Sequence, residues 1–409
     1  MSEEIFGKTV RFLARDEEGR QVVAVLVKRT FALDPRGGLS PCEEQAELVE
    51  EDELVPKETE PGAYPVAESE LVPFKLKTDV VVTGEVVAHH ERPVSEAWAG
   101  VEVGNHRKYV RVFGDRLIHQ TEGNRLRFSE PEPFTRLPLT WDRAYGGVDP
   151  SVPRNEDPST VEEWLEYLTL VRHPGVYPRN PVGRAYTVNR HAWMLEERPL
   201  PNFEDPDDLL TPERIVVGDP RRWWVQPLPA GLGWFGRAWY PRSVLGGLMP
   251  PFPPEQASVR EVRMGWLSPD HMSRGEARTM DDGPDPTFFN GASPGLALPR
   301  LKGDEPMRLL GLHPEGERRF TLPGVVPDIR MAFRGNALAT STHLHTLWVR
   351  ADEDRAWMVW SGMAPTPERL PLTLPTREKP EIDELEGVDV WVDGMHLPHE
   401  TVDMGTAHF

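Results

Sequence analysis

Short apolar runs separated by polar turns fill the first third of the chain, a pattern that indicates β-strands. Residues 10–14 and 22–33 lie on either side of the turn RDEEGR and predict one hairpin. Residues 97–113 alternate apolar and polar positions around GNHR and predict a second hairpin. Residues 347–360 repeat this pattern around ADEDR. Closely spaced hairpins of this kind are typical of a β-sandwich or a barrel.

One helix is predicted within this β-rich pattern, at about residues 159–172. Ser159 and Glu162 have the spacing of a capping box, and the residues after them place apolar side chains at helical intervals. The pattern stops at Pro174-Gly175, as helices usually do before proline.

The patterns together predict a mainly β protein with a β-sandwich or jelly-roll-like core, a long Pro/Gly/Trp-rich irregular central region and few short helices. We expect four parts: an N-terminal β-sheet part at 1–135, a loop-rich region at 136–330 that includes the helix, a C-terminal β-hairpin at 331–380 that completes the sheet, and an acidic surface tail at 381–409.

Proline changes this picture, because 43 of the 409 residues are proline, about twice the usual frequency of roughly 5%. The same stretches carry most of the 13 Trp and 15 Phe residues. Aromatic side chains provide apolar area to bury, so we expect ordered loops held by aromatic packing instead of disorder.

The charge balance excludes two classes of partner. The formal net charge is −20, which opposes binding to nucleic acid or to anionic membranes. Cys42 is the one cysteine, so neither a disulfide framework nor a multi-cysteine zinc site is expected. No apolar stretch approaches the ~20 residues that span a bilayer, and the N-terminus has no signal-peptide pattern. We therefore expect a cytoplasmic protein with protein partners.

Motifs for cofactor, metal or carboxylate chemistry are weak. GLGWFG matches the dinucleotide fingerprint, but Pro241 follows too closely for the helix that the fingerprint needs. His343 and His345 are expected on one face of a strand, with no third metal ligand identified near them. The GDE sequence at 303–305 is interpreted as a solvated turn. We therefore predict no catalytic, cofactor-binding or metal-binding residues.

The stretch LTWDRAYGGVDP, residues 139–150, is interpreted as a structural corner. Trp141 and Tyr145 are expected to pack it, Arg143 to bind nearby carbonyls or a carboxylate, and Gly146-Gly147 to make the turn. Whether the corner faces the protein's own core or a bound partner stays open at this stage.

Eight motifs in order resemble the bacterial domain-of-unknown-function family 2169, which is found beside type VI secretion genes. The resemblance spans residues 6–365. The motifs are RVFGDR, PFTRLPLTWDRAYGG, RNPVGRAY, LPNFEDP, PLPAGLGWFGRAWYPR, DPTFFNGASP, LKGDEPMRLLGLHPEG and LWVRADEDRAWMVWSG.

The resemblance implies a non-enzymatic adaptor or chaperone, without a cofactor, that escorts an effector, often one with a PAAR-type tip domain, onto the VgrG spike. It supplies no catalytic residues, so the motif residues are expected to determine the fold or a protein interface. These residues, called the signature residues below, are Trp141, Asp142, Arg143, Tyr145, Gly146, Gly147, Asn180, Pro181, Gly183, Arg184, Trp234, Trp239, Arg242, Phe288, Phe289, Asn290, Gly303, Asp304 and Glu305.

Two alternatives stay open beside the adaptor. One is a hydrolase or carbohydrate-active enzyme that uses carboxylates in a β-sandwich groove, suggested by the Trp-rich loops. The other is a structural component of the secretion spike. The oligomeric state, the effector and the contact surface are not determined by the sequence.

Overall fold

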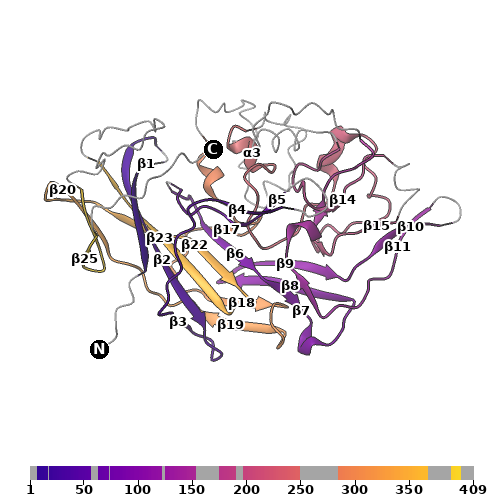
Figure 1. Cartoon of the computed structure of the whole chain (residues 1–409), viewed down its shortest axis with the longest axis horizontal. Coiled ribbons are helices and arrows are strands. Elements are labelled where there is room, and N and C mark those ends of the chain that lie inside the picture. Colours follow the sequence, from indigo (N-terminus) through magenta and orange to yellow (C-terminus); the bar gives the residue numbers. More distant parts are fainter. Residues whose placement is uncertain are drawn as a thin grey trace.

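The computed structural model describes residues 7–16, 18–56, 63–72, 74–121, 125–152, 175–189, 197–248, 284–366 and 388–397. The prediction of a mainly β fold is confirmed (Figure 1). The helix predicted at 159–172 lies outside the described residues. Among the described residues, none of the helices is both long enough and apolar enough to cross a membrane.

The largest sheet has seven strands among the described residues, in the order β1-β2-β23-β22-β6-β17, with β3 paired to β2. All neighbours are antiparallel except β22 and β6. The predicted hairpins β1–β2 and β22–β23 both belong to it. The strands are β1 (Lys8–Arg15), β2 (Gln21–Leu33), β3 (Leu39–Pro41), β6 (Thr78–Thr83), β17 (Ala297–Leu298), β22 (Ser341–Arg350) and β23 (Arg355–Pro365).

A five-stranded sheet packs against one face of the large sheet. Its order is β16-β9-β8-β18-β19, and the predicted hairpin around GNHR forms β8 and β9. Leu347 and Met358 of the large sheet share one buried cluster with Val101, Val110 and Leu309 of this sheet. The strands are β8 (Glu96–Val103), β9 (His106–Phe113), β16 (Phe203–Glu204), β18 (Pro306–Leu310) and β19 (Glu317–Thr321).

A four-stranded sheet, β21-β20-β24-β25, corrects the expectation of an acidic surface tail at 381–409. Within that range, β24 pairs with β20 and buries Val388, Val390 and Val392. The reason is the alternation in VDVWV, a strand pattern that the acidity of the surrounding residues masked. The strands are β20 (Ile329–Phe333), β21 (Asn336–Leu338), β24 (Val388–Val392) and β25 (Met395–His396).

The four-stranded sheet packs on β2 beside the five-stranded sheet. Val23, Val25 and Val27 of β2 share a buried cluster with Met331 and Val390. Ala24 and Leu26, on the other face of β2, are also buried. Burial on both faces explains why β2 is an almost continuous apolar run instead of an alternating one.

Short elements connect the sheets and order the loop-rich region. In Figure 1, β10, β11 and β15 lie at the opposite end of the molecule from β20 and β25. The remaining strands are β4 (Glu53–Pro56), β5 (Ala63–Ala67), β7 (Glu85–Val87), β10 (Leu117–Thr121), β11 (Arg125–Phe128), β12 (Arg136–Pro138), β13 (Tyr145–Gly146), β14 (Arg184–Ala185) and β15 (Arg198–Pro199). The described helices are α3 (Arg242–Leu245) and the 3-10 turns η1 (His89–Glu91), η2 (Trp141–Arg143), η3 (Pro220–Val225) and η6 (Pro286–Phe289).

Irregular segments form a third layer on the other face of the large sheet. Trp234 packs its ring at right angles on Trp348 of β22, with centroids 5.9 Å apart. Lys28 of β2 forms a buried ion pair with Glu70, and Asp79 of β6 forms one with Lys75. Glu70 and Lys75 both lie in the connection between β5 and β6. The Pro/Gly/Trp-rich loops are therefore a packed layer of the fold, which we call the loop layer.

Candidate functional site

The corner at 139–147 is joined to residues 179–186 by backbone contacts. β13 and β14 pair in parallel, and the Gly147 amide donates to the Asn180 carbonyl at 2.8 Å. Gly146 and Gly147 have φ of 145° and 93°, and a Cβ on either would lie 2.2 Å from a backbone oxygen. Only glycine combines these dihedrals with so close an approach.

Side chains of the corner point into the protein. The Trp141 indole N–H donates to the Trp234 carbonyl at 2.5 Å. The Asn180 amide donates to the carbonyls of Trp141 and Tyr145, at 2.8 and 3.1 Å. The Tyr145 hydroxyl donates to Gln226 at 3.0 Å, and burial raises the pKa of this tyrosine well above its usual value. The corner is thus a network of buried hydrogen bonds inside the loop layer.

Arg143 and Arg184 lie at the half-buried rim of the corner. Both guanidinium groups donate to the Asn202 side-chain oxygen, at 3.0 and 3.3 Å. The Asn202 amide nitrogen in turn donates to the Phe113 carbonyl at the end of β9. Asn202 therefore ties the corner to the five-stranded sheet.

Replacing Arg143 with Ala is expected to lower the free energy of unfolding by about 1–2 kcal/mol, because Asn202 loses a charged donor. Equilibrium urea unfolding followed by tryptophan fluorescence measures this change. The same variant should bind a protein partner as the wild type does. Weaker binding at unchanged stability would instead place Arg143 in an interface.

The signature residue Arg242 stabilises the loop layer through buried charges. Arg242 is fully buried and donates to both carboxylate oxygens of Glu68, at 2.9 and 2.7 Å. Arg237 lies 3.1 Å from the same carboxylate. Burial alone raises the pKa of Glu68, but Arg242 and Arg237 outweigh it and lower the pKa to about 2.

The pKa of the neighbouring buried acid Glu70 is shifted in the opposite direction to that of Glu68. Glu70 has one close partner, the Lys28 ammonium at 2.9 Å. Burial raises the pKa of Glu70, and Lys28 only partly offsets that effect. Glu68, with two guanidinium groups, remains a carboxylate far into the acid range. It is therefore the electrostatic anchor of this layer.

The FFNGA motif reaches the large sheet through Asp79. The Asn290 side chain and the Gly291 amide donate to the Asp79 carboxylate at 2.9 and 2.8 Å, and the Lys75 ammonium lies 2.6 Å from it. The aromatic rings of Phe288 and Phe289 are buried beside α3. These contacts fasten the motif to β6.

The signature residues fall into a small exposed or half-buried group and a larger buried group. Exposed Asp304 and half-buried Glu305 lie in a turn before β18, where the Glu305 carboxylate accepts from the Gly303 amide at 2.9 Å. Asp142, Arg143 and Arg184 are half-buried. The buried ones are Trp141, Tyr145, Gly146, Gly147, Asn180, Pro181, Gly183, Trp234, Trp239, Arg242, Phe288, Phe289, Asn290 and Gly303.

The histidines and the GLGWFG glycines have packing contacts. A bulge between Leu344 and Thr346 disturbs the register of β22 at His345. Burial and the charge of Lys75 lower the pKa of His345 well below its usual value. Gly231 lies against the ring of Trp141. In the part of the chain that the structure describes, no group of three metal-ligating side chains occurs.

The outer face of the five-stranded sheet carries an exposed tryptophan together with a tyrosine and several arginine side chains. Trp98 is 43% exposed, and the Arg111 guanidinium lies 5.0 Å from the centre of its ring. Tyr109 lies directly across from Gly100, where a Cβ would be 2.3 Å from the tyrosine ring. Gly100 therefore lets the Tyr109 ring lie flat across β8.

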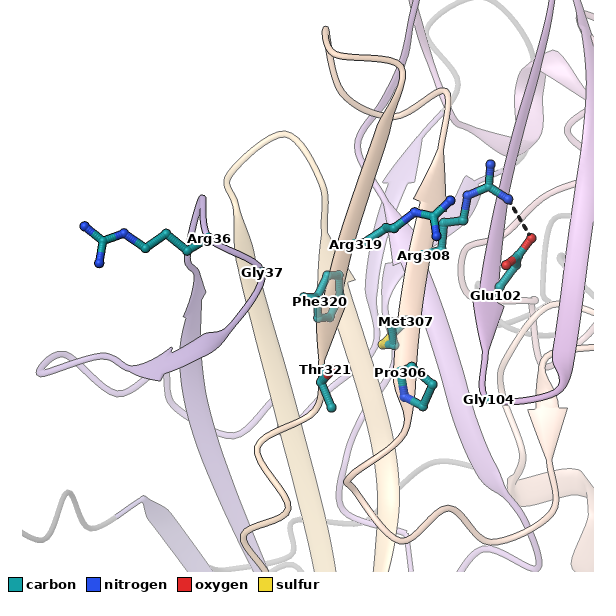
Figure 2. Close-up of a pocket in the computed structure, with 10 residues that line it drawn as sticks. All are labelled: Arg36, Gly37, Glu102, Gly104, Pro306, Met307, Arg308, Arg319, Phe320 and Thr321. Atoms are coloured by element: carbon teal, nitrogen blue, oxygen red, sulfur yellow. Dashed lines mark hydrogen bonds and ion pairs between the residues drawn. The ribbon is translucent and has the colours of Figure 1, made fainter.

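Beside these aromatics, a row of ion pairs crosses β8, β18 and β19. Arg308 donates to Glu102 at 3.0 Å and to Glu317 at 2.8 Å, and Arg319 donates to Glu317 at 2.8 Å. Figure 2 shows Arg308 and Arg319 side by side, with Glu102 linked to Arg308. They line an open depression of about 390 Å³. We define the outer face as Trp98, Glu102, Arg107, Tyr109, Arg111, Arg308, Glu317 and Arg319.

Comparison with protein families decides the identity of the chain at the family level. The model of a family described as an uncharacterized protein conserved in bacteria, DUF2169, matches residues 18–361. The chain belongs to this family. No curated protein and no solved structure matches it.

The DUF2169 match covers the elements that build the corner and the outer face. It includes every signature residue together with β8, β9, β18 and β19. β1, β24 and β25 lie outside the matched range. The matched range therefore includes the five-stranded sheet, the loop layer, most of the large sheet and the strands β20 and β21.

Two acids that pair with buried cations of this DUF2169 chain are not indicated by any motif in its sequence. Glu68 and Glu70 lie in an acidic stretch that contains none of the predicted motif residues, yet both are buried. The available signal was the mixture of these acids with Val66, Ala67 and Leu71 in VAESEL. Asn202 was present within the motif LPNFEDP, but no spacing rule connects it to Arg143.

Proposed function

We propose that the protein is a non-enzymatic adaptor that binds an effector with a PAAR-type tip domain and helps load it onto the VgrG spike. The outer face of the five-stranded sheet is the proposed effector-binding surface. The proposal rests on the resemblance of the ordered motifs to family 2169, which is found beside type VI secretion genes; that resemblance implies an adaptor or chaperone.

The single observation that carries the choice of surface is the exposed Trp98 with its stacked Arg111. Tryptophan, tyrosine and arginine are the residues that most often dominate the binding energy of protein interfaces. Here all three types lie together on a sheet face, positioned by β8 and β9. The signature residues of the corner, by contrast, are buried and provide the scaffold.

The charge of the face indicates the chemistry of the partner. Four arginines and three glutamates, Glu96 included, point outward from these strands, whereas the whole chain has a net charge of −20. This face has one more arginine than glutamate and is therefore much less acidic than the chain as a whole, which favours a partner with an acidic patch. We expect that patch on the effector.

Replacing Trp98 with Ala is expected to weaken effector binding by about 2 kcal/mol, or roughly 30-fold in Kd, as hot-spot truncations do. Arg319→Glu should weaken binding and reduce its salt dependence. Calorimetric titration of the effector, and co-elution with effector and spike proteins, measure both effects.

Leu209 provides a matched control, since it is 40% exposed and lies outside the five-stranded sheet. Leu209→Ala should bind the effector with unchanged Kd. Equal binding by all three variants would remove the outer face from the proposal, and failure of the wild type to bind either protein would overturn the adaptor function. Retention of the protein in assembled spikes after loading would favour the structural-component alternative.

A further inference from the structure

A second pocket lies where three signature motifs meet the start of β9. Asp205 of LPNFEDP, Pro229 of PLPAGLG and Pro294 of FFNGASP line it together with Lys108 and Tyr109. Its volume is about 310 Å³. Lys108 points to the opposite side of β9 from Arg107 and Tyr109. Those two residues of the outer face also line the pocket, so the pocket borders the outer face.

The Lys108 ammonium is the chemical feature of this pocket. It donates to the Ser293 hydroxyl at 2.5 Å and to the Pro294 carbonyl at 2.6 Å, both neutral acceptors. The Ser293 hydroxyl donates onward to the Gly231 carbonyl at 2.6 Å. Among the described residues, no carboxylate lies within ion-pair distance of Lys108. One of its three N–H donors is left for a ligand.

Three other buried cations are each paired with a carboxylate. Lys28, Lys75 and Arg242 each bind a buried carboxylate directly. Removing a charge from water without a partner is costly, and burial lowers the pKa of Lys108 to about 7, with the charge of Asp205 acting in the opposite direction. Lys108 differs from these three, because it is a half-buried cation whose hydrogen-bond acceptors are neutral.

We propose that this pocket binds a compact monocarboxylate, whose oxygens accept from the Lys108 ammonium. Asp205 and Asp207 also line the pocket, and Arg107 lies beside them. The two aspartates repel a dianion or a phosphate, so a single carboxylate with a small uncharged body fits best. The proline walls contact that uncharged body. Such a group belongs either to a free small acid or to the C-terminus of a partner peptide.

A bound carboxylate favours the charged form of Lys108 and therefore raises its pKa. Binding is then strongest below pH 7 and weakens as the pH rises through 7, by up to tenfold for each pH unit until the pKa of the complex is reached. Arg107, Tyr109, Asp205 and Asp207 are the titratable groups around the ammonium, and none of their ordinary pKa values lies between 6 and 9.

The test follows Lys108 directly, by NMR of the full chain labelled at the lysine Cε carbon. Lys108→Met assigns the signal, and Lys108→Arg retains the charge. Acetate serves as the free acid, and a blocked alanine peptide with a free C-terminus is compared with its amidated form. We expect saturating carboxylate to raise the pKa of Lys108 by about 1, with a matching tenfold difference in affinity between the two protonation states.

The arms of the experiment assign the source of the ligand. Tighter binding of the free-carboxylate peptide than of acetate assigns the site to a partner terminus, and the reverse assigns it to a free acid. An unchanged pKa of Lys108 with both probes, or an equal shift with inorganic phosphate, overturns the proposal. Lys302→Met, at an exposed lysine, should leave acetate binding unchanged. The test does not depend on the proposed adaptor function, because the probes are measured without an effector.

Discussion

Replacing Glu68 with Gln is expected to lower the free energy of unfolding by about 3–5 kcal/mol at neutral pH. The variant leaves Arg242 fully buried without its carboxylate, and breaking a buried ion pair on one side is strongly destabilising. Arg237, 3.1 Å from Glu68, loses the same partner. Urea unfolding followed by tryptophan fluorescence measures the loss.

The effect depends on pH in a defined direction. The pKa of Glu68 is lowered from 4.5 to about 2 in the folded protein. A carboxyl whose pKa is lowered in the folded state stabilises the protein fully at pH values above its pKa in the unfolded state. That stability is lost as the pH falls to its pKa in the folded state. The difference between the pKa of Glu68 in the unfolded and folded states corresponds to a stabilisation on the order of 3 kcal/mol. The difference between wild type and Glu68→Gln should therefore shrink between pH 4.5 and pH 2.

Glu353 offers the control, because it pairs with Arg350 in a hairpin turn where both side chains are exposed. Glu353→Gln should change the free energy of unfolding by less than about 1 kcal/mol at any of these pH values. A loss in Glu68→Gln no larger than in this control, or a loss that persists unchanged at pH 2, would contradict the role of Glu68 as the anchor.

Replacing Gly147 with Ala is expected to lower the free energy of unfolding by at least about 3 kcal/mol or to abolish folding. Gly147 has φ of 93°, and a Cβ there would lie 2.2 Å from the Gly183 carbonyl oxygen. The strain of a positive φ costs about 1–2 kcal/mol, and overpacking adds about 1–3 kcal/mol. The obstacle is backbone, so relief requires separation of β13 from β14.

Gly335 separates the two contributions. It has φ of 80° but no atom within 4 Å of its Cβ position. Gly335→Ala should therefore cost only the strain of about 1–2 kcal/mol. Soluble yield and urea unfolding of both variants give the comparison. Similar losses in the two variants would show that close backbone approach at the corner has no role in stability.

The three predicted hairpins were accurate because each is decided locally. Apolar or alternating runs on either side of a polar turn specify which residues pair, and β1–β2, β8–β9 and β22–β23 follow this pattern. The strand β24 was missed because five residues of alternation within an acidic stretch give a weak local signal. Its partner β20 lies far away in sequence, and that pairing supplies its stability.

The candidate surfaces depended on contacts that no local pattern contains. Trp98 and Arg319 are 221 positions apart in the sequence, and the antiparallel pairing of β8, β18 and β19 brings them onto one face. Lys108 was one of many charged residues in a predicted strand. Only the folded chain shows that two neutral acceptors surround its ammonium group.

By itself, the sequence determined the mainly β class, the hairpin pairs, the ordered aromatic loops and the family motifs, because these rest on local alternation, turn chemistry and composition. The tertiary structure decided which side of each motif is buried. Trp141 and Asn180 turn inward because Gly146 and Gly147 bring two backbones into contact, whereas Trp98 remains exposed on its sheet face. Burial is a property of residues distant in sequence that meet in space, so it appears only when the sheets and loops are packed together.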